Sequence, residues 1–293
     1  MDGIINFNKP EGMTSHDAVN YFRRLLNIKR IGHTGTLDPD ATGVLPICIG
    51  KATRVSEYLL NADKEYIARL KLGSETDTQD SSGSIIHTSD LEVSEEDIIK
   101  SFNKFIGKIK QVPPMYSALK YKGKKLYELA REGKVVERKP REVFIYQLKI
   151  LEIIGNREVV FYTKCSRGTY IRTLCNDIGR DLGTYGHMTE LQRVGVGQFK
   201  LEDSYSMEYL NRLSKDEIKK ILLPIDMALK DLDEIILEDK DYKRVANGAL
   251  VALVADLSMD KNYRVYCGDE FIGVGKLIVK NNRKYLKMDK VFI

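Results

Sequence analysis

Two strand patterns joined by a tight turn limit the fold of this chain more than any other feature. Residues 143–154 and 159–165 are rich in Val, Ile, Phe and Tyr, and Gly155-Asn156 between them tolerate the positive φ of a hairpin turn. A helix is predicted directly afterwards, because apolar residues recur at helical spacing: Ile171, Leu174, Cys175, Ile178 and Leu182. A long hairpin followed by an amphipathic helix predicts an α+β fold.

The other patterns also alternate between strands and helices, with no repeat or heptad array. Residues 4–7 predict a short strand, and residues 15–26 predict a helix that Thr14 or Ser15 caps. Residues 65–73 alternate as a half-buried strand does, and Ser94 caps a predicted helix that continues to Phe105. Residues 32–50 are dense in Gly, Thr and Pro, so a long ordered loop is expected there.

The C-terminal part, residues 229–293, has a different texture. Short strands with glycine turns are predicted at residues 263–267, 271–274 and 284–288, which together indicate a small β-rich appendage. This part of the chain contains the basic residues Lys276, Lys280, Arg283, Lys284, Lys287 and Lys290. They would suit an RNA contact, second to that of the basic segment described below, although solubility explains them nearly as well.

Length, cysteine content and the lack of long apolar stretches indicate the cellular compartment in which this protein is expected. The chain has 293 residues, enough for one large domain or for a domain with a smaller partner. Its four cysteines form no C-x-x-C pair and match neither a disulfide framework nor a zinc site, which fits a reducing compartment. The N-terminus does not resemble a signal peptide, and no stretch reaches the ~18 apolar residues of a membrane span. We therefore expect a soluble, cytoplasmic protein with no membrane partner.

Positive charge is concentrated in one segment. The chain has a net charge of +5, and residues 120–142 contain nine basic and four acidic side chains, so the whole excess can lie there. Tyr116, Tyr121 and Tyr127 are interleaved with this charge, a combination that suits a phosphate backbone and stacked bases. The alternative is a solvated helix face, because residues 123–131 look helical.

The loop at residues 32–43 holds one strong acid and one imidazole. Asp38-Pro39 alone would be an ordinary turn, since Asp caps nearby amides and Pro fixes the next φ. Glycines and threonines surround it, however, and His33 precedes it by five residues. Glycines allow close approach to a ligand, and such loops carry catalytic groups. The pair can be an Asp nucleophile with a neighbour, an Asp/His acid-base pair, or two metal ligands; no other histidine has ligand-like spacing.

Five ordered segments of the chain resemble TruB-family pseudouridine synthases. The loop Gly32-His33-Thr34-Gly35-Thr36-Leu37-Asp38-Pro39, with residues 41–45, is similar to the catalytic loop of that family. The other four segments also match in order: residues 8–15 (NKPEGMTS), 64–66 (KEY) leading to 72–73, 165–174 (CSRGTYIRTL) and 187–193 (HMTELQR). Together they span residues 4 to about 199, and the tail resembles the small PUA RNA-binding module more weakly.

The resemblance implies a mixed, mainly antiparallel central sheet flanked by helices and loops. It also implies an isomerase that breaks the N-glycosidic bond of a tRNA uridine and rejoins the base through carbon 5, without metal or cofactor. Asp38 matches the nucleophile of the family, and a carboxylate suits that task. Arg172 matches the arginine partner, which should hold Asp38 ionised and orient it.

The same resemblance assigns the base pocket. The target uridine, number 55 of the T loop, must be flipped out of its stack. Tyr66 matches the tyrosine that packs on the flipped base and accepts or relays the carbon 5 proton, and Leu191 matches an apolar pocket residue. His33 matches a histidine that takes the place of the base in the loop stack. Lys9 matches a pocket residue that either braces the catalytic loop or meets a phosphate.

Residues 112–142 resemble an insertion that stand-alone bacterial members close over the T arm. Lys120, Lys122, Lys124 and Arg141 are the expected tRNA contacts, and Gly123 and Gly133 would allow movement, so we expect the insertion to be mobile without RNA. The implied domains are residues 1–228, catalytic, and 229–293, PUA-like. No protein partner is required, and a monomer is expected.

Two other functions stay open. A catalytically silent tRNA binder or folding helper would keep the basic segment but should have lost Asp38 or Arg172, and both are present. A hydrolase using Asp38 and His33 would need a positioned water and usually a second acid or a metal, which the sequence does not indicate.

Overall fold

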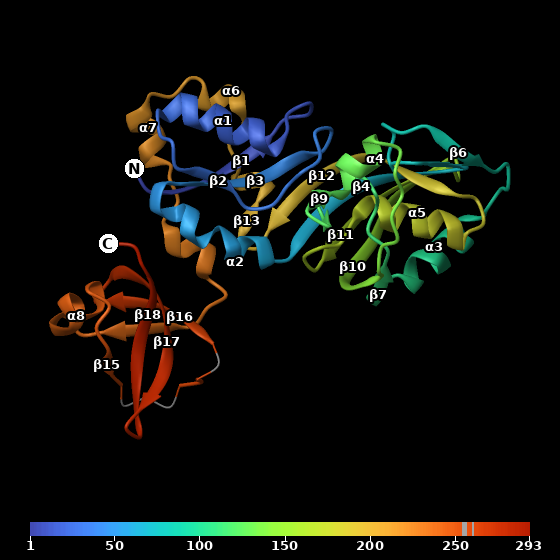
Figure 1. Cartoon of the computed structure of the whole chain (residues 1–293). Coiled ribbons are helices and arrows are strands. Elements are labelled where there is room, and N and C mark those ends of the chain that lie inside the picture. The colour runs from blue at the N-terminus through green and yellow to red at the C-terminus, as the bar shows by residue number, and fades with distance from the viewer. Residues whose placement is uncertain (254–256, 260) are drawn as a thin grey trace.

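The computed structural model describes residues 1–253, 257–259 and 261–293 (Figure 1). Its centre is a mixed sheet of order β1-β3-β12-β4-β11-β10-β7, in which β2 also pairs with β3 and β13 with β12. Neighbouring strands are antiparallel except β12 and β3. The strands are β1 (Gly3–Lys9), β2 (Ile31–His33), β3 (Thr42–Ile49), β4 (Lys64–Leu72), β7 (Gly107–Gln111), β10 (Arg141–Ile154), β11 (Glu158–Cys165), β12 (Gly186–Val196) and β13 (Phe199–Lys200). The predicted α+β class with a mainly antiparallel sheet is confirmed.

Three helices that the sequence predicted cover the sheet. Thr14 and Asp17 form a capping box that begins α1 (Ser15–Leu26), and Ser94 and Asp97 form another that begins α3 (Glu95–Lys104). The helix predicted after the hairpin is α5 (Ile171–Asp181). The shorter helices are α2 (Ser56–Asn61), α4 (Leu126–Arg131), α6 (Met207–Leu210), α7 (Lys215–Lys220) and α8 (Tyr242–Ala246), with 3-10 turns η1 (Gly50–Val55), η2 (Leu201–Asp203), η3 (Ile225–Leu229) and η4 (Asp239–Asp241).

The helices divide the sheet into two halves with separate cores. Helices α3 and α5 bury Phe102 and Leu174 against β4, β10 and β11. Helix α1 buries Phe22 against β1 and β3, together with α6 and α7. Each such side chain contributes about 1.5–3 kcal/mol when it is fully buried. Tyr66 of β4 and Leu191 of β12 pack against both cores, so they lie at the seam between the halves.

The prediction of a loop over residues 32–50 is wrong for residues 42–49. Residues 42–49 form β3, which pairs with β1 on one side and with β2 and β12 on the other. The strand is buried from Gly43 to Ile49, so it lacks the alternation of a half-buried strand. Pro46 within it also argued against a strand. Only residues 34–41, between β2 and β3, form the loop, which begins where β2 ends at His33.

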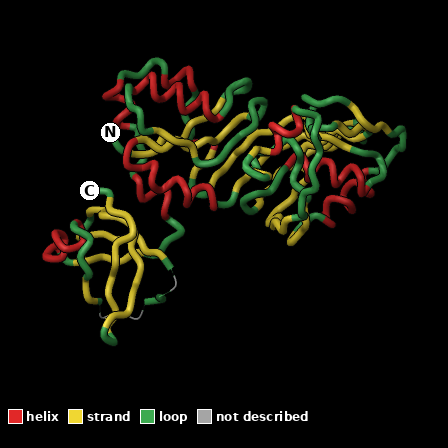
Figure 2. Tube along the Cα trace, in the orientation of Figure 1, coloured by secondary structure: helices red, strands yellow, loops and turns green. Residues whose placement is uncertain are grey.

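The predicted β-rich appendage is present as a separate sheet of order β14-β16-β17-β18-β15 with its own core (Figure 2). Its strands are β14 (Glu234–Leu237), β15 (Val251–Ala252), β16 (Asn262–Cys267), β17 (Glu270–Lys280) and β18 (Arg283–Val291). It contacts the preceding part of the chain, because Arg54 donates to the carbonyl of Val291 at 2.7 Å and lies over the Phe292 ring. Lys290, suggested as an RNA contact, instead donates to the carbonyl of Arg54 at 2.7 Å and contacts Tyr58 and Glu57, so it serves this interface.

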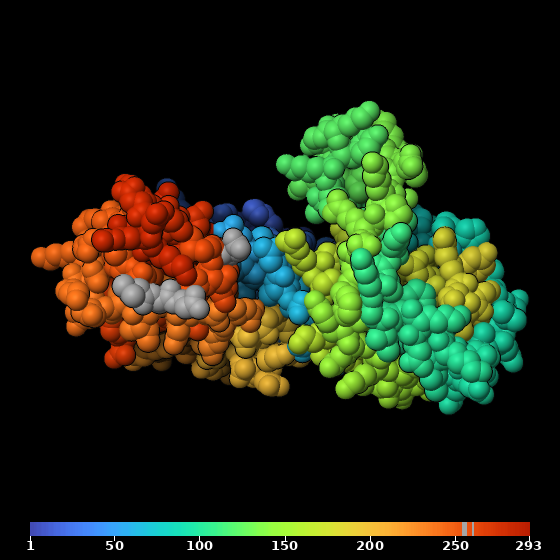
Figure 3. All heavy atoms as spheres, turned by 90° about the horizontal axis from the view of Figure 1, so that it is seen from below, coloured from blue at the N-terminus to red at the C-terminus, as the bar shows by residue number. Residues whose placement is uncertain are grey.

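The insertion between β7 and β10 projects from the body as the green lobe of Figure 3. It contains α4 and a small hairpin of β8 (Lys120–Tyr121) and β9 (Lys124–Lys125), held by a small core of Met115, Leu126 and Leu129. The helix predicted over residues 123–131 therefore begins at Leu126, three residues after its predicted start. Lys122 and Gly123 both have positive φ, 48° and 89°, which makes a hairpin turn and not a helix start. A further hairpin, β5 (Ser74–Thr76) and β6 (Ile85–Thr88), leaves the end of β4.

Candidate active site

The loop that carries Asp38 is anchored to helix α1. The hydroxyl of Ser15, the first residue of α1, accepts from the amide of Leu37 at 2.8 Å and donates to its carbonyl at 3.2 Å. The Leu37 side chain is buried in the core beneath α1. Asp38 comes next, and its side chain is 41% exposed. The loop is thus anchored by a buried side chain, and the carboxylate that it carries is only partly exposed.

Lys9 lies at the end of β1, and its side chain is fully buried. Its ammonium donates to the carbonyls of Pro10, Met13 and Pro39 at 2.8, 2.7 and 3.0 Å. Burial lowers the pKa of Lys9 to about 8. All three ammonium hydrogens have an acceptor in these backbone groups. Of the two roles that the sequence left open for Lys9, these contacts favour bracing the catalytic loop over meeting a phosphate.

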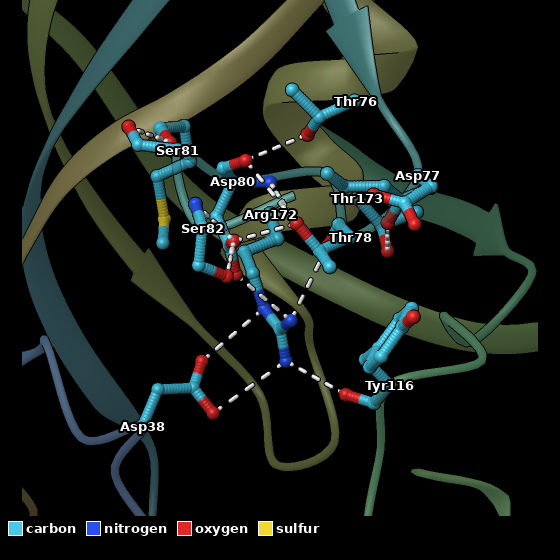
Figure 4. A network of polar contacts seen from close by, with 12 residues as sticks. Asp38, Thr76, Asp77, Thr78, Asp80, Ser81, Ser82, Tyr116, Arg172 and Thr173 are labelled. Carbon is cyan, nitrogen blue, oxygen red and sulfur yellow. Dashed lines mark hydrogen bonds and ion pairs between the residues drawn. The ribbon is translucent and has the colours of Figure 1, made fainter. Parts of the chain in front are cut away.

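Arg172 joins three segments around Asp38 (Figure 4). It lies in the first turn of α5, and only 8% of its side chain is exposed. Its Nε lies 3.2 Å from Oδ2 of Asp38, and its Nη2 lies 3.5 Å from Oδ1. Nη1 donates to Asp80 at 3.0 Å and to the carbonyl of Thr78 at 3.3 Å, while Nη2 donates to the carbonyl of Tyr116 at 2.9 Å. The guanidinium is therefore held in one orientation with its fork toward the nucleophile candidate.

The pKa of Asp38 reflects opposing influences. Burial raises the pKa of Asp38 above its ordinary value, Arg172 lowers it, and the carboxylates of Asp80 and Asp40 raise it. The expected arginine is in place, but its effect does not outweigh the other influences. Asp38 consequently takes up a proton at a higher pH than an exposed aspartate.

Asp80 is a site residue that the sequence analysis did not identify. It lies in a turn after β5, where its carboxylate accepts from the Thr78 hydroxyl at 2.7 Å and the Ser82 amide at 3.0 Å. Its carboxylate accepts from Arg172, which lies 92 residues later in the sequence. Thr78, Ser81 and Ser82 around it signal only a polar turn, so no local pattern distinguishes this aspartate from others in residues 74–97.

The wall of the site is formed where β4 and β12 pair. Tyr66 is partly buried, and burial raises its pKa to about 12, so its hydroxyl is protonated at neutral pH. Its cross-strand partner Arg193 donates to the carbonyl of Gly35 in the Asp38 loop at 3.2 Å, so Tyr66 lies beside that loop. Leu191 lies opposite Ala68, two residues along from the register pair Tyr66 and Arg193. The tyrosine ring and the leucine thus offer an apolar surface beside the carboxylate.

His33 ends β2 at the entrance to the loop and is partly buried. Its Nδ1 accepts from the amide of Gly35 at 3.3 Å. Burial lowers the pKa of His33, and the nearby charge of Arg193 lowers it further, so the imidazole is neutral at pH 7. No hydrogen bond or ion pair joins His33 to Asp38 within the described residues.

The predicted basic contacts are not part of this cluster. Lys120, Lys122 and Lys124 lie exposed on the hairpin of the insertion, where Lys124 pairs with Glu132 at 3.1 Å. Arg141 begins β10 at the base of the insertion and is also exposed. The carbonyl of Tyr116 links this lobe to Arg172. The structure therefore joins Asp38, Arg172, Tyr66, Leu191, His33 and Lys9 in one place and leaves the basic residues on the adjoining lobe.

Neither a membrane helix nor a metal cluster is found in the described part of the chain. None of its helices is long and apolar enough to cross a bilayer. No group of three or more His, Cys, Asp or Glu residues there is arranged to hold a metal ion. All four cysteines are free and buried.

Comparisons with known proteins give matches over most or all of the chain. Residues 23–171 match the family described as TruB family pseudouridylate synthase (N terminal domain), and residues 172–230 match the tRNA pseudouridylate synthase B C-terminal domain. Curated relatives named tRNA pseudouridine synthase B, from Clostridium kluyveri and Clostridioides difficile, are each 46% identical over the full length of both chains. A solved structure titled as a Cbf5-Nop10-Gar1 complex contains a chain that is 30% identical, with a TM-score of 0.78, covering 99% of this chain and 85% of that one.

Proposed function

Because this chain belongs to the TruB family of pseudouridine synthases, which are isomerases, we propose that it converts uridine 55 in the T loop of tRNA to pseudouridine, with Asp38 as nucleophile. The observation that carries this proposal is the carboxylate of Asp38, partly exposed on an anchored loop and held by the fork of Arg172. A turn aspartate has no need of a buried arginine, whereas a nucleophile must be oriented.

The chemistry requires the ionised form of Asp38. A carboxylate can add to the sugar or the base and then leave, which splits the transfer into two easier steps. The raised pKa of Asp38 makes its carboxylate a better nucleophile when it is ionised, and Arg172 orients it. No metal or cofactor is part of the proposed reaction, since the base itself is the group that is transferred.

The flipped uridine would be received between Asp38 and the wall of Tyr66 and Leu191. Flipping costs a few kcal/mol of stacking, which the tyrosine ring can partly replace. His33 is neutral and lies at the entrance to the loop, so it can occupy the gap that the base leaves without adding charge. We assign it this displacing role, and no proton transfer.

The insertion and the C-terminal domain would hold the tRNA. Lys120, Lys122, Lys124 and Arg141 are exposed along one lobe, as phosphate contacts must be. We propose that the lobe is mobile until it closes over the T arm, that residues 229–293 are a PUA-like RNA-binding domain, and that the protein works as a cytoplasmic monomer. Limited proteolysis with and without tRNA tests the closure: cleavage within residues 120–141 should slow when tRNA is bound, and equal rates would contradict it.

The two other functions are less well supported. A silent binder or folding helper would not need the Asp38–Arg172 pair, which is intact. The hydrolase would need His33 to act with Asp38, yet His33 accepts from the Gly35 amide and makes no contact with Asp38 within the described residues. Asp80 is a second acid nearby, but it is bound to Arg172 and to its own turn.

The experiment compares three proteins on unmodified tRNA. Pseudouridine is mapped by carbodiimide-dependent primer stops after incubation with wild type, Asp38→Asn or Asp40→Asn. Asp40 is an exposed aspartate of the same loop and serves as the matched control. We expect stops at position 55 with wild type and Asp40→Asn and none with Asp38→Asn. Wild type without stops at position 55 would refute the proposed function, and stops with Asp38→Asn would refute the nucleophile.

A further inference from the structure

Arg193 occupies the junction between the two halves of the central sheet. On β12 it lies opposite Tyr66 of β4 on one side and opposite Gly43 of β3 on the other. Its side chain is 1% exposed and is the largest of the fully buried side chains. Neither the reaction proposed above nor the comparisons assign it a role.

The guanidinium of Arg193 donates hydrogen bonds to two separate segments of the site. Nε donates to the carbonyl of Val44 in β3 at 2.7 Å, and Nη2 donates to the carbonyl of Gly35 in the catalytic loop at 3.2 Å. On β12 Arg193 is the direct cross-strand neighbour of Tyr66, and its charge lowers the pKa of the Tyr66 hydroxyl against the rise that burial causes. One side chain therefore links the loop of Asp38 to the strand pair that carries the predicted stacking platform.

The surroundings of Arg193 are unusual for a buried cation. No salt bridge of the described residues includes it, although buried arginines are ordinarily paired with carboxylates. Its charge instead acts on other basic groups, since it contributes to the lowered pKa values of Lys9, His33 and Lys64. A hydrophobic side chain would fill the same volume without this cost, so packing alone does not explain an arginine here.

A guanidinium can only donate hydrogen bonds. Any hydrogen bond between these neighbours has the Tyr66 oxygen as acceptor, so the cation favours a Tyr66 O–H that is directed away from Arg193. A tyrosine without this neighbour could rotate its hydroxyl freely.

We propose that Arg193 is a positioning residue of the isomerisation, which holds the Tyr66 hydroxyl and the Asp38 loop in one fixed relation. This rests on the proposed function, because it assumes that Asp38 and Tyr66 act on the same uridine. The residue touches neither base nor sugar and acts through Tyr66 and the loop. Misplacement of reacting groups by about 1 Å costs on the order of 100-fold in rate, which is the effect expected from its loss.

The test uses Arg193→Met, Arg193→Lys and both changes in a Tyr66→Phe background. Single-turnover rates on unmodified tRNA, tRNA affinity by filter binding, and thermal melting are measured for each protein. We expect Arg193→Met to lower the single-turnover rate by about 100-fold with less than about a threefold change in affinity. In the Tyr66→Phe background the same change should cost at least about tenfold less, because the hydroxyl on which Arg193 acts is already absent.

Arg193→Lys guards against misfolding, because it keeps the charge but lacks the planar fork whose N–H groups reach the carbonyls of Val44 and Gly35 together. We expect it to melt close to the wild type and to show the same rate loss and the same dependence on Tyr66. Rate losses that are equal in both backgrounds would overturn the proposal, as would losses confined to affinity. Both variants unfolding would assign Arg193 to the core alone. Failure of the proposed function is distinct, since wild type would then form no pseudouridine.

Discussion

Gly43→Ala should be far more damaging than alanine at a glycine with a similar positive φ and open space around it. Gly43 has φ +102°, and a Cβ built there would lie 2.2 Å from the carbonyl oxygen and 2.9 Å from the nitrogen of Arg193. Relief requires β3 and β12 to separate by ~1 Å, because both atoms belong to the backbone. These strands join the two halves of the sheet through only two register pairs, Thr42 with Gln192 and Gly43 with Arg193.

The expected loss of stability combines two costs. A non-glycine residue at this φ costs about 1–3 kcal/mol, and each backbone hydrogen bond lost at the junction costs about 1 kcal/mol. The sum is about 3–5 kcal/mol, which corresponds to a Tm lower by roughly 6–20 °C. Because the junction also sets the distance between the Asp38 loop and Arg172, the isomerisation rate should fall on the order of 100-fold in protein that remains folded.

Gly107→Ala is the matched control. Gly107 has φ +95° at the start of β7, and its Cβ would meet nothing within 4 Å, so only the backbone cost applies. Thermal melting and single-turnover kinetics are compared for wild type and the two variants. If the free energies of unfolding of Gly43→Ala and Gly107→Ala agree within about 1 kcal/mol, the steric argument is wrong.

Three further predictions concern charge. Asp80→Asn should move the acid limb of the pH–rate profile to lower pH, because Asp80 raises the pKa of Asp38 and activity requires the ionised form of Asp38. The control Asp77→Asn, in the same turn, should leave the acid limb in place. An unmoved acid limb for Asp80→Asn would contradict the coupling between Asp80 and Asp38. Burial raises the pKa of Asp177 to about 6 from an ordinary 3.8, so stability falls as pH rises through this window. Asp177→Asn should therefore stabilise by about 1–2 kcal/mol at pH 7.5, after allowance for solvent screening, and by nothing near pH 3 in calorimetry. Replacing Lys120, Lys122 and Lys124 with Ala should reduce the steepness with which the logarithm of the tRNA association constant falls with the logarithm of salt concentration by about 2–3. The same change at Lys215, Lys219 and Lys220 on α7 should leave this slope unchanged. If the insertion variant has the same slope as the wild type, the insertion makes no phosphate contacts.

The sequence predicted the elements whose pattern is local. The hairpin around Gly155-Asn156 forms as expected, and both turn residues have positive φ, 55° and 52°. Helices α1 and α3 begin at their predicted caps. These features depend on side-chain periodicity and capping within a few residues, so the order of the amino acids is sufficient to specify them. Family resemblance, and not periodicity, identified Asp38, Tyr66 and Arg172.

Contacts between distant segments decided the rest. The strand β3 was mistaken for loop because burial on both faces removes alternation, and that burial exists only when β1, β2 and β12 surround it. The glycine at position 43 was expected to admit a ligand, but it admits the backbone of Arg193. Asp80 and Arg193 carry no local signal, since each acquires its role from a partner at least 92 residues away or on another strand.

The sequence by itself determined the α+β class and the positions of the main helices, and its resemblance to the family led to the proposal of Asp38 as nucleophile. Tertiary structure decided what surrounds that aspartate: Arg172 with Asp80 on one side, Lys9 beneath the loop, and Arg193 between the loop and Tyr66. The physical reason is that helix periodicity and capping act over a few residues, whereas the orientation and pKa of a carboxylate depend on every charge and dipole within several ångströms, whatever its distance along the chain.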